Sequence, residues 1–334
     1  MPSLLWEKGT QAGEIICQAC VHGCHLKNGA RGRCGVRVNK NGELLSMVEN
    51  LVSSAQLDPV EKKPLYHFLP GSKAFSIGSI GCNFRCDFCQ NHHISTIPKD
   101  GIVPGKRTTP KSIVDMAVNH HAASVAFTYN EPTVFPELIN DTATMAKSRG
   151  LHVILVSNGF MSEQFRSLLR NKVDAVNVDL KSFSENFYKT YCGGHLEPVL
   201  ENLKAIHKLG WWLEVTTLVI PGLNDSDAEL ANCARFIHDE LGADVPWHLT
   251  AFHGAHKMAS HSSTSLDRLE SAWRIGKSAG LHFVYLGNVV SAVGSNTWCP
   301  SCGALVVERL PWKTVQPSVG RCPGCGSSIA GVWR

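Results

Sequence analysis

The sequence predicts an α/β protein: a partial barrel of the (β/α)6 type with a small cysteine-rich module at each end. Between about residues 73 and 287, short apolar segments alternate with longer amphipathic stretches, a pattern typical of a parallel sheet with crossover helices. All of the thirteen cysteines except Cys192 and Cys233 gather in three groups. We therefore expect one domain at 71–290, flanked by modules at 1–70 and 291–334.

The composition fits a globular protein, because 43% of the residues are hydrophobic and 18% are charged. A net charge of +4 is too small to indicate a nucleic-acid or membrane partner. No apolar run approaches the ~18 residues of a membrane span, and the first eight residues lack the pattern of a secretion signal. These features predict a cytoplasmic protein, in which so many cysteines indicate metal binding rather than disulfides.

The central cysteine group follows the first predicted strand with the spacing C-x3-C-x2-C, and consists of Cys82, Cys86 and Cys89. Three thiolates can hold three irons of a [4Fe-4S] cluster and leave the fourth iron open. An open metal position indicates chemistry, whereas a closed one indicates structure. A zinc site and buried free thiols are the alternatives. The aromatic, Asn and Gln residues around these cysteines, and the preceding strand, argue against both.

This spacing resembles the signature of the radical S-adenosylmethionine (radical SAM) superfamily. The resemblance implies that the amino and carboxylate groups of S-adenosylmethionine (SAM) chelate the open iron. It also implies that Cys82, Cys86 and Cys89 are the ligands of a catalytic cluster.

Polar residues recur where the predicted strands end. We expect strands at 74–80, 124–128, 152–156, 175–178, 213–219, 247–252 and 282–286, with helices such as 111–120 and 225–241 between them. The active site of such a barrel lies at the carboxyl ends of its strands. The candidate cofactor-binding residues in or after these strands are Asn130, Glu131, Asn158, Asp179, Lys181 and His248.

SAM offers an ammonium, a carboxylate, a ribose diol and an adenine edge. Glu131 can accept from the ammonium, and Lys181 can pair with the carboxylate. Asp179 can accept from ribose hydroxyls, and Asn158 supplies an amide. The alternatives are a surface ion pair between Asp179 and Lys181, and a Glu131 carboxylate that caps a helix. His248 either binds a ligand or is a structural, partly buried histidine.

The first cysteine group has the spacing C-x2-C-x3-C-x9-C, and consists of Cys17, Cys20, Cys24 and Cys34. Four cysteines this close, with several glycines among them, suit a loop wrapped on one metal centre, either zinc or iron–sulfur. The segment 36–45 then predicts a hairpin that turns at Asn41-Gly42.

The last cysteine group has two matched C-P-x-C-G knuckles, formed by Cys299, Cys302, Cys322 and Cys325. The pattern predicts a closed tetrahedral site for zinc or a single rubredoxin-like iron, with a strand around Val306 and Val307. Its expected role is structural, or electron delivery if the metal is iron.

Along essentially the whole chain these motifs, with 66–72, 246–248 and 287–288, resemble the radical SAM protein of the AmmeMemoRadiSam system. That family is related to the activating enzymes of glycyl-radical enzymes. The resemblance implies reductive cleavage of SAM to methionine and a 5′-deoxyadenosyl radical that abstracts a hydrogen from a substrate. It places Asp179 and Lys181 against the cofactor, and implies an external electron donor of the flavodoxin or ferredoxin type and association with Memo-type and Ammecr-type proteins.

Two alternative functions stay open. One is a glycyl-radical enzyme activase similar to pyruvate formate-lyase activase, which needs a protein partner with a glycine-bearing loop. The other is a non-catalytic interaction protein in which all three cysteine groups hold zinc.

Overall fold

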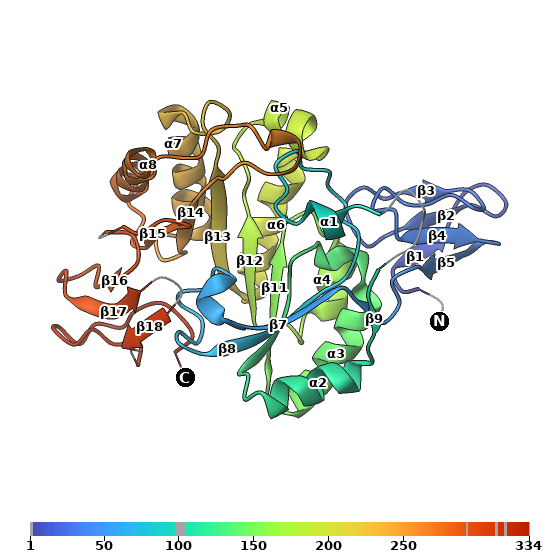
Figure 1. Cartoon of the computed structure of the whole chain (residues 1–334), viewed down its shortest axis with the longest axis horizontal. Helices are drawn as coiled ribbons and strands as arrows, with labels where there is room; N and C mark the ends of the chain where they lie inside the picture. The colour runs from blue at the N-terminus through green and yellow to red at the C-terminus, as the bar shows by residue number, and fades with distance from the viewer. Residues whose placement is uncertain (1–2, 98–103, 292, 311–312, 317–318, 334) are drawn as a thin grey trace. The chain divides into compact units, whose positions relative to one another are not determined.

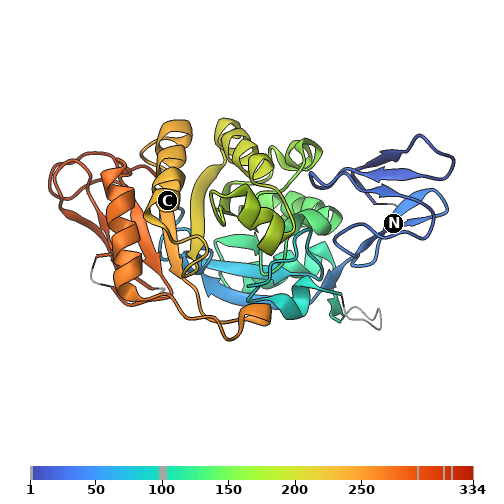
Figure 2. The ribbon, with the colours of Figure 1, turned by 90° about the horizontal axis from the view of Figure 1, so that it is seen from above.

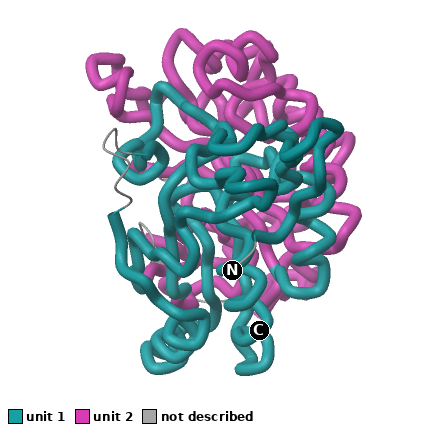
Figure 3. Tube along the Cα trace, turned by 90° about the vertical axis from the view of Figure 1, so that its right-hand side faces the viewer, with its two compact units in different colours: residues 1–57, 74–174 teal, residues 58–73, 175–334 magenta. Residues whose placement is uncertain are grey.

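The computed structural model describes residues 3–97, 104–291, 293–310, 313–316 and 319–333. The chain forms two compact units (Figure 3). The first comprises residues 1–57 and 74–174, and the second comprises residues 58–73 and 175–334. The division into modules at 1–70, 71–290 and 291–334 stays a prediction.

The first unit is built on a parallel arrangement of strands. In sheet order these are β11 (His152–Ser157), β10 (Ser124–Phe127) and β8 (Lys73–Gly78), which pair in parallel. Strand β7 (Ser54–Pro59) lies next to β8, and the hydrogen bonds from Ser53 to Gly78 and from Val60 to Ser72 are those of an antiparallel pair. Ser124 lies opposite both Ala74 and His152, so β8, β10 and β11 start level with one another. All four residues of β10 are buried, as expected for a parallel strand covered on both faces.

Helices connect these strands, and capping residues in the sequence explain where two of the helices begin. The helices of this unit are α1 (His92–Ser95), α2 (Pro110–Asn119), α3 (Pro136–Ser148) and α4 (Glu163–Leu169), with a 3₁₀ turn at Pro132–Val134. Thr109 caps α2 by accepting from the Ser112 N–H, and Ser162 caps α4 by accepting from the Phe165 N–H. The predicted helix at 111–120 is confirmed as α2.

The cysteine-rich N-terminal segment forms small antiparallel sheets (Figure 1). Its strands are β1 (Trp6–Lys8), β2 (Ile15–Cys17), β3 (His25–Leu26), β4 (Arg37–Lys40) and β5 (Glu43–Ser46), followed by β6 (Leu51–Val52), which pairs with β9 (Lys106–Arg107). The predicted hairpin is confirmed as β4–β5. Asn41 and Gly42 have φ angles of 56° and 85°, the two positive values that a type I′ turn requires.

The second unit continues with parallel strands. These are β12 (Ala175–Asp179), β13 (Trp212–Val219), β14 (Trp247–Ala251) and β15 (Val284–Gly287). Its helices are α5 (Glu185–Phe187), α6 (Leu196–Leu209), α7 (Asp227–Phe236) and α8 (Leu266–Ser278), with π-helical turns at Tyr188–Cys192 and Ile237–Leu241 and 3₁₀ turns at Val60–Lys62 and His256–Met258. Helix α8 packs on β14 and β15 (Figure 2).

The predicted helix at 225–241 is confirmed as α7 and its π-helical extension. The predicted α/β class with a parallel sheet is also confirmed. Within the described ranges, no helix has the length and apolarity needed to cross a bilayer.

The C-terminal segment forms an antiparallel ribbon of β16 (Thr297–Trp298), β17 (Leu305–Leu310) and β18 (Lys313–Gln316). Strand β17 contains the predicted Val306 and Val307. The buried guanidinium of Arg309 lies 4.5 Å from the centroid of the Tyr66 ring and donates to the Tyr66 carbonyl at 2.7 Å. This cation–π contact and hydrogen bond hold β17 against the segment that precedes β8.

A buried carboxylate organises the second unit. Glu214 has no exposed surface and accepts from the backbone N–H groups of Tyr66 and His67 at 2.9 and 2.8 Å. It also accepts from Trp212 Nε1 at 3.0 Å and from His248 Nε2 at 2.6 Å. Burial alone would raise the pKa of Glu214, but the interaction with His248 and the backbone hydrogen bonds lower it below its usual value.

We expect Glu214→Ala to lower the free energy of unfolding by about 3–5 kcal/mol, because it leaves His248 and several buried N–H groups without an acceptor. Since the folded-state pKa of Glu214 is depressed, its contribution is present above the unfolded value of about 4.5 and is lost as the pH falls through the folded value. Urea unfolding should therefore show a difference between wild type and variant that is large at pH 7 and shrinks in acid. A pH-independent difference would contradict this account.

Candidate functional site

The three central cysteines lie on the loop that joins β8 to α1. The backbone N–H of Phe84 points at Cys82 Sγ at 3.4 Å, and the Cys89 N–H donates to the Cys86 carbonyl at 3.2 Å. Cys89 Sγ lies 3.4 Å from Ser95 Oγ. The loop is thus compact, and polar groups lie within hydrogen-bonding distance of the sulfur atoms of Cys82 and Cys89.

Two asparagine side chains fix the ends of this cysteine loop. Asn130, which is buried, accepts from the Ser79 N–H and donates to the Gly81 carbonyl, both at 2.9 Å. Asn91 donates to the Tyr129 carbonyl at 2.9 Å. The loops after β8 and β10 are therefore tied together from both sides. Asn130 lies beside the cysteine loop, and its predicted contact with SAM stays a prediction.

Asn158, at the end of β11, reaches the same loop. Its Nδ2 donates to Asn83 Oδ1 at 2.7 Å and lies 3.8 Å from Cys82 Sγ. Asn83 in turn donates through Nδ2 to Thr133 Oγ1 at 3.3 Å. Residues from the ends of three neighbouring strands thus meet at Cys82.

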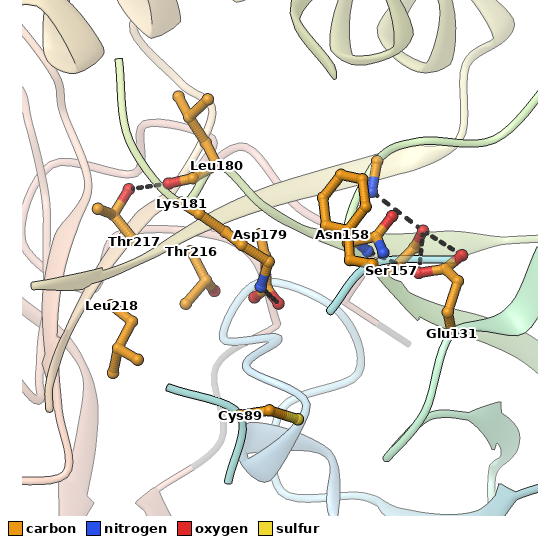
Figure 4. A network of polar contacts seen from close by, with 12 residues as sticks. Cys89, Glu131, Ser157, Asn158, Asp179, Leu180, Lys181, Thr216, Thr217 and Leu218 are labelled. Carbon is orange, nitrogen blue, oxygen red and sulfur yellow. Dashed lines mark hydrogen bonds and ion pairs between the residues drawn. The ribbon is translucent and has the colours of Figure 1, made fainter. Parts of the chain in front are cut away.

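Glu131 joins the loops after β10 and β11 (Figure 4). Its Oε1 accepts from the Thr133 N–H at 3.2 Å and from Ser157 Oγ at 2.9 Å. Its Oε2 accepts from the Asn158 N–H at 2.9 Å and lies 3.2 Å from Ser157 Oγ. Burial raises the pKa of Glu131, and these hydrogen bonds oppose the rise. The capping contact with Thr133, which the sequence offered as an alternative role, is present.

The environment of Cys82 suits a metal-bound thiolate. Burial raises the pKa of the Cys82 thiol well above its usual range, and the negative charges of Glu131 and Cys86 add to the rise. A thiolate in such a place requires a cation, and iron coordinated by sulfur supplies one. The Cys82, Cys86 and Cys89 donor set therefore fits the cluster that its spacing predicts.

In the second unit, Asp179 and Lys181 form an ion pair, with Lys181 Nζ 2.9 Å from Asp179 Oδ2 (Figure 4). The Lys181 backbone is held by Tyr188 Oη, which accepts from its N–H at 3.0 Å, and by Asn224 Nδ2, which donates to its carbonyl at 2.6 Å. The Lys181 side chain is mostly buried, whereas that of Asp179 is 37% exposed. The two residues are therefore paired, as the alternative had it, but Lys181 does not lie at the surface, and cofactor contacts for both residues stay predictions.

His248 is buried on β14 and contacts Glu214. Its ring centroid lies 4.8 Å from that of Tyr66 and 5.3 Å from that of Tyr285. These contacts are those of a structural histidine, the alternative considered from the sequence. A contact between His248 and SAM stays a prediction.

The four C-terminal cysteines converge as predicted, since their sulfur atoms all lie within 4.8 Å of one another. Cys299 and Cys325 are 3.7 Å apart at Sγ, and Cys302 and Cys322 are 3.5 Å apart. Metal–sulfur bonds of about 2.3 Å in a tetrahedron place sulfur atoms ~3.8 Å apart, so these distances fit one zinc or iron ion. A hydrogen bond with Ser327 lowers the pKa of Cys325 to about 6, which favours the thiolate.

Several site residues are not singled out by sequence. Asn83, Ser157 and Glu214 carry hydrogen bonds that no spacing rule predicts. Asn83 and Ser157 do lie within segments that the strand-end argument marks. Glu214 lies inside the strand Trp212–Val219. A charged residue in a mostly apolar strand has to find buried hydrogen-bond donors, and this was the signal in the sequence that could have identified it.

We expect Cys322→Ser to remove one metal ion per chain, because three thiolates hold a structural ion far more weakly than four. Metal analysis of purified protein measures this directly. Cys233→Ser is the matched control, since Cys233 is a buried thiol outside the three groups. Equal metal content in Cys322→Ser and wild type would disprove the site.

Comparison with known proteins finds a family model, relatives and solved structures similar to this chain. A model of the radical SAM superfamily matches residues 76–234. An uncharacterised protein of Methanocaldococcus jannaschii is 39% identical over 320 residues, which cover 95% of each chain. The pyruvate formate-lyase-activating enzyme of Clostridium pasteurianum is 23% identical over 50% of this chain and 72% of its own length.

More distant relatives agree. The benzylsuccinate synthase activating enzyme of Thauera aromatica is 25% identical over 52% of this chain and 56% of its own. The structure of Streptococcus suis SuiB bound to S-adenosylmethionine matches with a TM-score of 0.51 at 10% identity, over 70% of this chain and 53% of that one. That likeness shows the fold alone.

Proposed function

This chain belongs to the radical SAM superfamily, and we propose that Cys82, Cys86 and Cys89 hold the [4Fe-4S] cluster with which it cleaves S-adenosylmethionine. When bound, the cluster supplies the electron that splits SAM into methionine and a 5′-deoxyadenosyl radical, which takes a hydrogen atom from the substrate. The observation that carries the proposal is the convergence of three strand ends on Cys82, where amide groups of Phe84 and Asn158 point at a half-buried sulfur atom.

The chain's own residues would position the cluster and cofactor in distinct ways. Asn158 and the Phe84 N–H point at Cys82 Sγ and would moderate the charge of the thiolate. Glu131 was predicted to accept from the SAM ammonium. Both of its oxygens already accept hydrogen bonds from the Asn158 loop, which favours a role in positioning that loop.

Asp179 and Lys181 would meet the polar ends of SAM. Lys181 Nζ can pair with the methionine carboxylate while its backbone stays fixed. Asp179 uses Oδ2 for Lys181 and is partly exposed, so its other oxygen can accept from a ribose hydroxyl. Asn130 and His248 are proposed as further residues of the cofactor site, with contacts to the cysteine loop and to Glu214 respectively.

The reaction takes one electron from an external donor, and we propose a donor of the flavodoxin or ferredoxin type. The resemblance to the AmmeMemoRadiSam family adds Memo-type and Ammecr-type proteins as proposed partners, and we propose a cytoplasmic location. Activation of a glycyl-radical enzyme is a second candidate function, favoured by the similarity to named activating enzymes over about half of this chain.

We expect Cys82→Ala, Cys86→Ala and Cys89→Ala each to abolish SAM cleavage, because each removes an iron ligand. The measurement is 5′-deoxyadenosine formed by anaerobically reconstituted, dithionite-reduced protein, together with the cluster's electron paramagnetic resonance signal with and without SAM. Cys233→Ala is the control and should cleave normally. Wild-type cleavage in any of the three variants would sink the assignment, as would a cluster signal that ignores SAM.

We expect Lys181→Met to raise the SAM concentration that gives half-maximal cleavage about tenfold, since it removes one charge-assisted hydrogen bond. The iron content should not change. Lys147→Met is the matched control, because Lys147 forms a comparable ion pair with Asp174. Equal SAM dependence in the two variants would show that Lys181 only stabilises Asp179.

A further inference from the structure

The N-terminal cysteine loop lies directly against the loop that carries the catalytic cysteines. We propose that Cys17, Cys20, Cys24 and Cys34 bind a second, thiolate-held metal centre, and that this centre positions the Cys82 loop through His22. The proposal rests on the function proposed above only in taking Cys82 as a cluster ligand.

Among the described residues, only the C-terminal quartet has its sulfur atoms within 4.8 Å of one another. In the N-terminal group, the sulfur atoms of Cys24 and Cys34 are the two that a shared neighbour places close together. A Cβ built on Gly32 would lie 3.7 Å from Cys34 Sγ and 3.8 Å from Cys24 Sγ, so these two sulfur atoms face the same point. The Arg33 N–H points at Cys24 Sγ at 3.5 Å, an amide–sulfur contact of the kind found in metal knuckles.

The apolar support under this loop is small. Its strands β2 and β3 have three and two residues, and the apolar cluster under them consists of Ile15, Cys17, Ala19, Leu26 and Leu44. Modules this small depend on a metal or disulfides for stability. Four thiolates are a soft donor set, which suits zinc or an iron–sulfur cluster.

His22 carries the contact from this loop to the catalytic one. It lies between Cys20 and Cys24, and its Nε2 is 2.9 Å from the carbonyl oxygen of Asn83, the residue after Cys82. Because a carbonyl can only accept, Nε2 must carry the proton and donate. The imidazole also packs on Phe160, with ring centroids 4.7 Å apart.

Backbone contacts reinforce the link on the side of Asn158. The Val21 N–H donates to the Phe160 carbonyl at 3.1 Å, and Cys20 forms an antiparallel bridge with Met161. Ser162 Oγ donates to the Gln18 carbonyl at 2.5 Å. The metal-binding loop is therefore attached to the segment that follows Asn158 as well as to the segment that follows Cys82.

Gly81 shows how close the two cysteine loops lie. Its φ is +92°, and a Cβ there would lie 2.9 Å from the Cys34 carbonyl oxygen and 2.8 Å from Val36 Cγ1. Only glycine permits that approach. The backbone of the fourth N-terminal cysteine thus packs on the residue that precedes Cys82, so loss of order in one loop should be felt in the other.

Hydrogen exchange and metal analysis of the full chain, without SAM, test the proposal. We expect Cys24→Ser to lower the metal content and to speed amide exchange about tenfold or more in 17–34, 81–86 and 158–162, with no change in α8. Cys302→Ser, in the C-terminal quartet, is the control and should leave 81–86 as in wild type. Loss of zinc from Cys24→Ser would support the proposal and identify a zinc site. Loss of iron together with sulfide would also support it and identify an iron–sulfur cluster.

A variant that spares the metal isolates the His22 contact. We expect His22→Ala to keep the wild-type metal content yet exchange about fivefold faster at 81–86, because one hydrogen bond and the ring packing are lost. His22→Gln, whose amide can still donate to Asn83, should restore part of the protection. Unchanged exchange at 81–86 in His22→Ala would overturn the proposal, as would full metal content in Cys24→Ser. Since neither readout uses SAM, these results are separate from failure of SAM cleavage.

Discussion

The arrangement of the first unit depends on the burial of one carboxylate. Glu131 can be buried only because backbone and hydroxyl groups from two loops donate to it, and this requirement fixes Ser157 and Asn158 beside the end of β10. Once Asn158 is fixed, its amide determines where Asn83 lies, and Asn83 follows Cys82. The position of Cys82, the proposed cluster ligand, is thus linked to Glu131 by a chain of polar contacts.

The second unit also contains a buried carboxylate that is stabilised by hydrogen-bond donors, and here it supports the fold. Glu214 is buried among N–H donors of the segment at 66–67, of Trp212 and of His248. Removal of any donor would leave a charge or polar group unsatisfied, so the segment before β8 has one favourable position on β13. Arg309 then holds the C-terminal ribbon to that segment. His248, a candidate ligand-binding residue in the sequence, contacts Glu214 and so helps to stabilise this part of the fold.

The three cysteine groups differ in chemical character. The C-terminal sulfur atoms stand at the spacing of one tetrahedral ion. The central group has three sulfur atoms, and three ligands leave one iron of a cluster open. The first group is attached by His22 and by backbone contacts to the two loops that form the central site. If the first group binds a metal as we propose, that metal is connected through these contacts to the geometry of the Cys82 loop.

The sequence by itself determined the fold class, seven strands of the main sheet, the hairpin and the three cysteine groups, because periodicity, turn chemistry and ligand spacing are local properties. It did not predict β7. It also marked the strand ends from which Glu131, Asn158 and Lys181 project. Only the tertiary structure decided the partners of these residues: that Glu131 supports the Asn158 loop, that His248 contacts Glu214, and that His22 reaches Asn83. Buried polar groups form hydrogen bonds with whatever partners the folded chain brings near them. These partners lie far apart in the sequence, so local sequence patterns do not predict them.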